Sequence, residues 1–247
     1  MIDLHNHILP GVDDGSADME SSLQMGHILS ELGFRSIAAS PHLGVGPGGD
    51  VSPATATRVR EELGEAFRAE GIELELLPNS EHHVTFELFE RIEKSGVVSV
   101  GGESRWLLVE LPWMRITNVF EILFRIRVKG FKLLLAHPER YKYLSVEDAA
   151  ELVRQGVRLQ LDIGSFVGLY GTKALDKAKA YMDADLGHVF ATDLHSPDQA
   201  KDWLHEAMSL VEKNWGQDVL TRGLVDNPRS IVADMSAEEI LSVGGGE

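Results

Sequence analysis

Seven short apolar segments alternate with helical patterns along the whole chain. Between these segments apolar residues recur at helical spacing, as Met25, Ile28, Leu29 and Leu32 do. The expected strands are residues 1–7, 35–40, 72–77, 106–111, 131–137, 157–163 and 188–193. Such alternation predicts an α/β fold with a parallel sheet whose apolar strands are buried on both faces. A closed or distorted barrel suits seven strand–helix units, and an open doubly wound sheet is the alternative.

The composition favours a single domain over residues 1–247. The chain has 247 residues, 43% of them hydrophobic, which suffices for one large core. No linker rich in Pro, Gly or Ser divides it, and it has no internal repeat. We expect only a tail, from about residue 236 to residue 247, to be frayed.

Composition also excludes several classes of protein. Cysteine is absent, which excludes disulfides, thiolate metal sites and cysteine nucleophiles. A net charge of −16 argues against a nucleic-acid partner. The longest apolar runs, 107–109 and 133–136, are too short to span a bilayer, and no secretory signal pattern opens the chain. We therefore expect a cytoplasmic protein without membrane insertion, whose oligomeric state the sequence leaves open.

Histidines and carboxylates stand at or just beyond the ends of the predicted strands. In His5-x-His7, alternation along a strand places both rings on one face with Asp3, and Ile2, Leu4 and Asn6 on the other. The carboxyl ends of parallel barrel strands form one face, where active sites are built. The candidate metal ligands are His5, His7, Asp14, His42, Glu81, Glu110, His137, Asp193 and His195.

Each of these residues also has a plain structural interpretation. The two histidines of the first strand could be solvated on an edge strand, Glu110 could pair with a buried arginine, His137 could donate to a backbone carbonyl, and Asp193 could cap a helix. However, unpaired carboxylates in apolar strands are costly, and several at one end of a barrel favour metal ions as the remedy. Nitrogen and oxygen ligands without sulfur suit manganese, iron or zinc, and nine ligands suit three ions. The other histidines are interpreted as packing or surface residues: His27, His82, His83, His188 and His205.

Arg140 lies just beyond His137 in the sequence His137-Pro138-Glu139-Arg140. A guanidinium is a planar donor fork suited to phosphate oxygens. The alternative is a surface salt bridge with Glu139 or Glu147. The adjacent metal positions favour phosphate binding.

The motif Asp3-x-His5-x-His7-x-Leu9-Pro10-Gly11-x-Asp13-Asp14-Gly15 resembles the opening of the PHP (polymerase and histidinol phosphatase) superfamily. More narrowly, the chain resembles bacterial manganese-dependent protein-tyrosine phosphatases that accompany capsule and exopolysaccharide tyrosine kinases. The further matching segments, in order, are Pro41-His42, His137-Pro138-Glu139-Arg140, Gly164-Ser165-Phe166-x-Gly168-x-x-Gly171, Asp193-x-His195 and Asn227-Pro228. The resemblance covers almost the whole chain.

This resemblance implies a distorted (β/α)7 TIM-like barrel of the PHP fold that holds three divalent ions. Manganese is the first expectation, with iron, cobalt or zinc as alternatives. The implied ligand sets are His5, His7, Glu81 and Asp193 for the first ion, Glu81 as a bridge with Glu110 and His137 for the second, and Asp14, His42 and His195 for the third. Arg140 matches the phosphate-binding arginine of the family. A second arginine that the family often has after Asp-x-His is missing, and Lys201 is a candidate substitute.

The residues predict a phosphomonoester hydrolase in which metal-activated water attacks phosphorus. Arg140 would stabilise the developing charge, and Asp14 and His42 are candidates for a general acid. The resemblance implies phosphotyrosine in a protein as substrate and a bacterial tyrosine kinase as partner. The alternatives are a histidinol-phosphate or other small-molecule phosphatase and a non-catalytic metal-binding regulatory domain. An amidohydrolase-type barrel is less suitable, because no lysine stands at a middle strand end.

Two further features are expected near the substrate. The glycine-rich segment 44–49 lacks the Lys-Ser/Thr of a phosphate-binding P-loop and is interpreted as a mobile loop beside the site. Trp113, Tyr141 and Phe166 are the aromatic residues that could stack on a phenyl ring, with a place in the core as the more common alternative for each.

Overall fold

The computed structural model describes residues 1–43, 51–94, 96–114 and 118–244. The predicted glycine-rich loop at 44–49 lies outside the described residues, and so does the side chain of Lys201.

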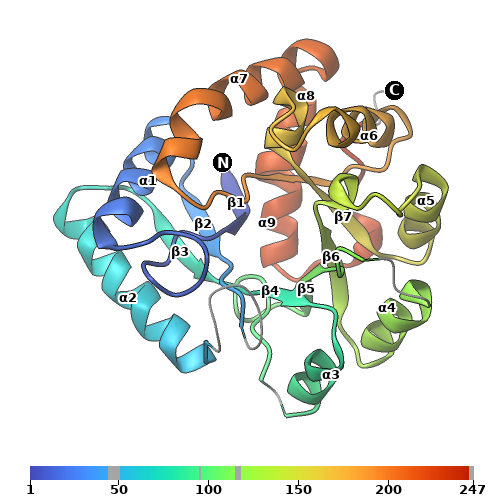
Figure 1. Cartoon of the computed structure of the whole chain (residues 1–247), viewed down its shortest axis with the longest axis horizontal. Coiled ribbons are helices and arrows are strands. Elements are labelled where there is room, and N and C mark those ends of the chain that lie inside the picture. Colours follow the sequence, from blue (N-terminus) through green and yellow to red (C-terminus); the bar gives the residue numbers. More distant parts are fainter. Residues whose placement is uncertain (44–50, 95, 115–117, 245–247) are drawn as a thin grey trace.

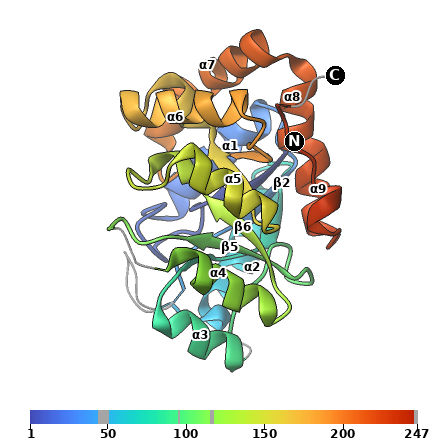
Figure 2. The same cartoon turned by 90° about the vertical axis from the view of Figure 1, so that its right-hand side faces the viewer.

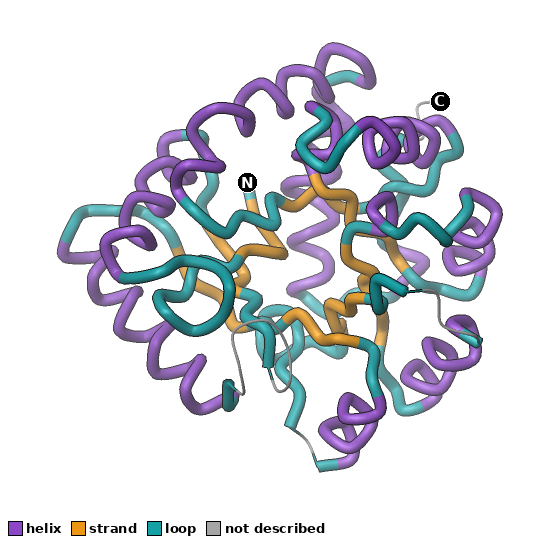
Figure 3. The backbone as a smooth tube through the Cα atoms, in the orientation of Figure 1, coloured by secondary structure: helices purple, strands orange, loops and turns teal. Residues whose placement is uncertain are grey.

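Parallel strands form the centre of the molecule and helices surround them (Figure 1 and Figure 3). The strands are β1 (Ile2–Asn6), β2 (Ser36–Ala39), β3 (Glu75–Pro78), β4 (Glu81–His83), β5 (Trp106–Glu110), β6 (Lys132–Ala136), β7 (Arg158–Asp162) and β8 (Val189–Ala191). The helices are α1 (Met19–Glu31), α2 (Pro53–Ala69), α3 (Phe86–Glu93), α4 (Val119–Val128), α5 (Val146–Arg154), α6 (Thr172–Asp183), α7 (Pro197–Trp215), α8 (Gln217–Thr221) and α9 (Asn227–Val232). None of the helices in the described parts of the chain has the length and apolarity needed to cross a membrane.

The strands form two parallel sheets that close into one barrel. One sheet has the order β1-β2-β3 and the other the order β4-β5-β6-β7-β8. Isolated bridges join the sheets on both sides, one from Asn6 to Leu194 and one from His42 to Glu81. The barrel prediction is confirmed, and the open sheet is excluded. The first joint lies at the carboxyl end of β1, and the second links the segment just beyond β2 to the first residue of β4; both involve or adjoin predicted site residues.

The third predicted strand, residues 72–77, corresponds to β3, and a short strand that was not predicted, β4, follows it. β3 pairs with β2, whereas β4 pairs with β5. Between them the Asn79 side chain donates to Leu4 O at 2.9 Å, and the Ser80 hydroxyl donates to Pro41 O at 2.9 Å. These bonds anchor the break to the first two strands. As a result Glu81 begins a strand of its own, whereas the sequence analysis placed it beyond the end of a strand.

The apolar core has two layers, one between the strands and the outer helices and one inside the barrel. The inner layer contains Leu4, Leu108, Leu134 and Val189, and Ile231 of α9 packs against it. Figures 1 and 2 together show α9 at one end of the barrel. This end is sealed by apolar contact, which leaves the opposite end for polar groups.

The prediction of a frayed tail is wrong for its described part, residues 236–244. Ile240 and Val243 are buried. Val243 N donates to Gly187 O at 2.8 Å, and the Asn227 side chain donates to Leu241 O at 2.6 Å. The tail is ordered because Ile240 covers apolar surface inside the barrel and Val243 packs into the outer layer.

Candidate metal centre

The nine predicted ligands meet at the carboxyl end of the barrel. They fall into groups whose donor atoms lie within 4.8 Å of one another. Four groups contain only predicted residues: His5, His7 and Glu81; His7, Asp14 and His42; His7, Asp193 and His195; and Glu81, Glu110 and His137. A fifth group joins His42 and Glu110 to His83, which the sequence analysis placed among ordinary packing residues.

A β-bulge in β1 positions its two histidines. Asp3 pairs with Ile37 and Asn6 with Ala39, so β1 has one residue more than β2 over this stretch. Bulges of this kind redirect side chains beside active sites. The Asn6 side chain therefore reaches Asp3 Oδ2 at 3.0 Å, although alternation predicted opposite faces for the two residues. The prediction that Asp3 and Asn6 point to opposite faces of the first strand is therefore wrong.

Asp3 does not join the cluster of candidate ligands. Its carboxylate accepts hydrogen bonds from Thr192 N at 3.1 Å and from Thr192 Oγ1 at 2.6 Å. Burial raises its pKa, and the hydrogen bonds only partly offset that effect. Asp3 thus ties β1 to the segment after β8 and helps to close the barrel.

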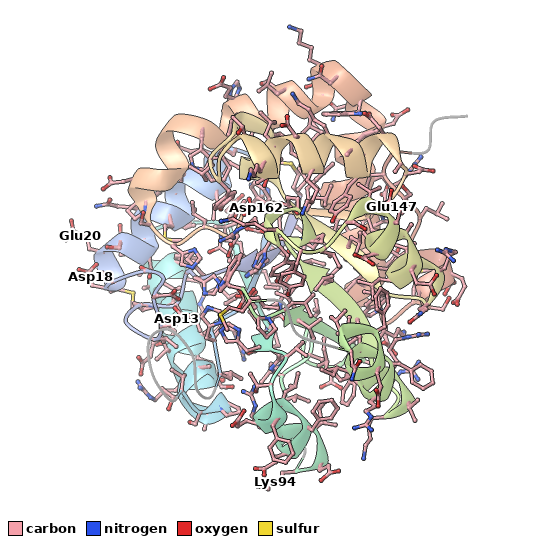
Figure 4. The ribbon with its side chains drawn as sticks, turned by 45° about the vertical axis from the view of Figure 1, so that its right-hand side comes forward. Asp13, Asp18, Glu20, Lys94, Glu147 and Asp162 are labelled. Carbon is pink, nitrogen blue, oxygen red and sulfur yellow. The ribbon has the colours of Figure 1, made fainter. Side chains whose placement is uncertain are left out.

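Hydrogen bonds orient both imidazoles of β1. His7 Nδ1 donates to Asp13 Oδ2 at 2.8 Å, and His5 Nδ1 donates to Gln160 Oε1 at 2.9 Å. The two Nε2 atoms then face the cluster, 3.1 Å apart. Partners of this kind fix the tautomer of metal-binding histidines. Asp13 lies in the inner part of the molecule in Figure 4, and its side chain is 1% exposed.

The cluster holds strongly coupled charges. Burial disfavours ionised carboxylates, but His5 and the neighbouring imidazoles hold the pKa of Glu81 and that of Asp193 well below their usual range. Burial likewise lowers the pKa of His5, yet Glu81 and Asp193 outweigh it and raise that pKa to about 9. A proton on His5 balances the carboxylates, and a divalent ion would replace it.

Asp193 Oδ1 shows how well these residues fit a metal ion. Nitrogen atoms of His5, His7 and His195 lie 3.1, 3.4 and 3.8 Å from it. The oxygen is buried, yet no hydrogen bond satisfies it. The rings and the carboxylate are therefore directed at common points between them and not at each other. Nitrogen and oxygen donors in this arrangement fit a divalent ion.

Two of the predicted ligands have a strained backbone. His137 has a φ of 34° and Asp193 a φ of 48°, in the left-handed region that residues with a side chain rarely adopt. Each residue stands just past the end of its strand. Such conformations cost about 1–3 kcal/mol and gather at functional sites.

The structure places Glu110 and His137 in contact with other members of the cluster. Glu110 lies 2.7 Å from His83 Nδ1 and 3.8 Å from His137 Nε2, so two imidazoles are its neighbours in the cluster. His137 Nε2 contacts Glu81 Oε1 at 3.0 Å, not a backbone carbonyl. His83 stands two residues after Glu81 on β4, the same spacing as His5-x-His7, and this signal was available in the sequence.

Arg140 reaches the edge of the cluster. Its Nη1 lies 2.5 Å from Asp193 Oδ2 and 3.6 Å from Asp162 Oδ2. The predicted alternative, a salt bridge with Glu139 or Glu147, is not found among the described residues. Figure 4 shows Glu147 apart from Asp162.

Aromatic rings hold the Arg140 guanidinium. Its central carbon lies 4.1 Å from the centroid of the Tyr170 ring and 5.0 Å from that of Trp113. Trp113 is 52% exposed and stacks on His137 with centroids 5.6 Å apart. Tyr170 was not predicted, although it falls within the Gly168-x-x-Gly171 motif.

The other two aromatic residues lie in the core, the alternative to stacking on a substrate. Tyr141 is fully buried, and its hydroxyl accepts a hydrogen bond from Leu111 N. Phe166 packs edge-on against Phe190 and Trp215 in the core. Of the three expected rings, only Trp113 is accessible beside the cluster.

The closed parallel barrel and the imidazole–carboxylate cluster at its carboxyl end define an α/β barrel protein with a candidate metal centre. The family model described as "Capsular polysaccharide synthesis, CpsB/CapC" matches residues 1–233. The chain belongs to the CpsB/CapC family.

Curated relatives in this family are named tyrosine-protein phosphatases. YwqE of Bacillus subtilis is 29% identical over 222 residues, which cover 89% of this chain and 87% of YwqE. CpsB of Streptococcus pneumoniae is 26% identical over 251 residues, which cover 95% of this chain and 99% of CpsB.

Solved structures agree with the fold. A crystal structure from work on YwqE and CpsB, described there as unique metal-dependent tyrosine phosphatases, has a TM-score of 0.85 at 29% identity and covers 96% of both chains. The phosphotriesterase homology protein of Escherichia coli has a TM-score of 0.57 at 11% identity, covers 94% of this chain and 97% of its own, and shares the fold.

Proposed function

We propose that the protein is a metal-dependent phosphatase that removes phosphate from phosphotyrosine in proteins. The observation that carries the proposal is the position of the Arg140 guanidinium, which lies beside Asp193 at the edge of the cluster. The activity named for YwqE and CpsB supports the same reaction.

In this proposal the nine predicted ligands hold three divalent ions, manganese first, with iron, cobalt or zinc as alternatives. His83 is an additional candidate ligand, because it faces Glu110 at 2.7 Å. When bound, such ions supply Lewis acidity for the phosphate oxygens and activate water. Asp13 and Gln160 orient His7 and His5 for this purpose.

Arg140 binds the phosphate in this mechanism and stabilises the charge that develops on its oxygens. Tyr170 and Trp113 restrict the plane of the guanidinium, so little side-chain freedom is lost when phosphate binds. The chain has no cysteine, so the reaction has no cysteinyl-phosphate step.

Asp14 is the more exposed of the two candidates for a general acid, both of which are also proposed metal ligands. Its side chain is 41% exposed, with Oδ1 3.6 Å from His42 Nε2. Burial lowers the pKa of His42, which favours a neutral ring that binds metal. A phenolate leaving group, whose conjugate acid has a pKa of about 10, needs less proton donation than an alkoxide.

The partner in this proposal is a bacterial tyrosine kinase of capsule or exopolysaccharide synthesis. The two proteins interact in the cytoplasm in this proposal. The family description, capsular polysaccharide synthesis, supports this setting.

Turnover of small and peptide substrates tests the proposal. With saturating manganese, kcat/KM on a tyrosine-phosphorylated peptide should exceed kcat/KM on phosphoserine peptides and on histidinol phosphate. A tenfold preference for histidinol phosphate would overturn the substrate assignment. Absence of turnover with every metal would favour a non-catalytic metal-binding domain.

A further inference from the structure

A groove of about 630 Å³ opens beside Arg140 and extends away from the candidate metal ligands. Trp113, Arg140 and Tyr170 line its inner part, and Lys173 and Ala180 of α6 line its wall. A groove of this size takes more than a phosphate group, since pockets of about 300–1,000 Å³ hold whole small ligands. Bound phosphotyrosine at Arg140 would therefore leave room in it for a neighbouring part of the substrate.

The charge of the groove is opposite to that of the chain. The whole chain has 23 basic and 39 acidic residues. Among the described residues that line the groove, in contrast, four are cationic (Arg140, Lys142, Lys173 and Lys177) and two are acidic (Glu139 and Asp176).

Lys142 and Lys173 supply the available charge. Both side chains are exposed, and neither forms an ion pair with another described residue. Lys177 is different, because its Nζ donates to Tyr141 O and Leu144 O. Lys177 therefore stabilises the wall of the groove, while the other two lysines face whatever enters it.

The two acidic residues differ in the same way. Glu139 is 2% exposed and accepts hydrogen bonds from Asp162 N and Ser165 Oγ, both at 2.8 Å. Asp176 is exposed on the rim, three residues after Lys173 on α6. Of the two described acidic residues in the groove, Asp176 is therefore the one that weakens the positive electrostatic potential of Lys142 and Lys173 at the surface.

We propose that this groove is a specificity subsite that binds an aspartate or glutamate side chain lying close to the phosphotyrosine in the substrate protein. The inference rests on the proposed phosphatase function and adds the substrate class: phosphotyrosine in an acidic segment. Lys142 and Lys173 pair with the carboxylate, and the apolar walls of Val146, Ala174 and Ala180 contact the peptide. Trp113 separates this subsite from the candidate ligand His137.

Paired peptides test the subsite. Each pair contains phosphotyrosine flanked by aspartate and glutamate, or by asparagine and glutamine at the same positions. For the unmodified protein with manganese, kcat/KM should be higher on the acidic peptide by roughly tenfold, and the ratio should fall at high salt, because exposed charge pairs are weak and screened. Equal kcat/KM on both peptides would overturn the proposal.

Substitutions in the groove test whether its lysines cause the preference for the acidic peptide. The double variant Lys142→Gln/Lys173→Gln should bring the ratio close to one, and Asp176→Asn should increase it. Lys179→Gln is the matched control, because Lys179 is exposed on the same helix and does not line the groove. If the double variant kept the full ratio, or Lys179→Gln lost it, the subsite would be placed wrongly.

The experiment separates this inference from the proposed function. Hydrolysis of p-nitrophenyl phosphate by the unmodified protein with manganese tests the phosphatase reaction alone. Failure there overturns the proposed function, whereas hydrolysis without discrimination between the peptides overturns only the subsite.

Discussion

Asp13 Oδ2 accepts a hydrogen bond from His7 Nδ1 at 2.8 Å and thereby directs His7 Nε2 into the cluster of candidate ligands. The same oxygen accepts from His42 N at 3.0 Å, so a single carboxylate organises two strand ends. Burial opposes its ionisation, but the bonds from His7, Gly15 and His42 hold the pKa of Asp13 below its usual range.

Asp13→Ala should therefore weaken metal binding about 10–100-fold, the usual effect of losing such a partner. Asp18→Ala is the control, because Asp18 in the same loop caps α1 through Ser21 N. That variant should lose about 1 kcal/mol of stability and keep its metal affinity. Metal titration and thermal unfolding distinguish the two effects, and equal metal affinities would show that Asp13 is only a loop residue.

Removal of metal should abolish turnover. Bound metal ions lower the pKa of water in the proposed mechanism, so dialysis against a chelator should remove activity and manganese should restore it. The measurement is p-nitrophenyl phosphate hydrolysis before and after readdition, with metal content determined in each sample. Full activity in metal-free protein would contradict the proposed mechanism.

Arg140 and His137 should separate phosphate binding from metal binding. Arg140→Ala should keep its metal and lose roughly 2–4 kcal/mol of transition-state stabilisation, because the guanidinium is the donor beside the site. His137→Ala should lose metal from the group that it forms with Glu81 and Glu110. Wild-type kinetics for Arg140→Ala would mean that its only role is the ion pair with Asp193.

The two ends of the chain should both matter, for different reasons. Deletion of residues 1–7 removes His5, His7 and the strand that closes the barrel, so folding and metal binding should be lost. Deletion of residues 243–247 removes buried Val243 and should cost roughly 1–3 kcal/mol of stability without loss of metal. Denaturant unfolding with metal analysis tests both, and a shortened tail with unchanged stability would show that the packing of Val243 is unimportant.

His188 should make the protein less stable in acid. Burial, with a smaller effect of Arg158, lowers its pKa from 6.5 to about 3. As the pH falls, His188 therefore takes up a proton at a higher pH in the unfolded chain than in the folded chain. The free energy of unfolding decreases as the pH falls from 6.5 towards 3, and above that range His188 has no such effect. The slope should be on the order of 1 kcal/mol per pH unit.

Urea unfolding between pH 5 and pH 7 in a chelator measures this slope. His188→Asn should flatten it, whereas His205→Gln, at an exposed position on α7, should leave it unchanged. Only the slope is compared, because His188 Nδ1 also accepts a hydrogen bond from Leu159 N and its loss lowers stability at every pH. Parallel curves for His188→Asn and the unmodified protein would contradict the assignment.

The local pattern of the sequence was enough to predict the barrel. It also predicted that the nine candidate ligands gather at the carboxyl ends of its strands. Strand and helix periods are properties of neighbouring residues, and the carboxyl ends of parallel strands necessarily meet. For that reason His42, Glu110 and Asp193, far apart in the chain, were predicted to lie together and do so.

Only the tertiary structure decided how these side chains are aimed. The bulge in β1, the break before Glu81 and the order of the tail depend on contacts with distant segments, such as Asn79 with Leu4 and Val243 with Gly187. The hydrogen bonds that orient the candidate ligands also depend on contacts between distant segments. Gln160 accepts a hydrogen bond from His5, which is 155 positions away in the sequence, and the spacing of neighbouring residues cannot predict such a pairing. The sequence alone brought the nine predicted ligands to one end of the barrel but missed His83, whereas long-range packing and hydrogen bonds determined the geometry of the site.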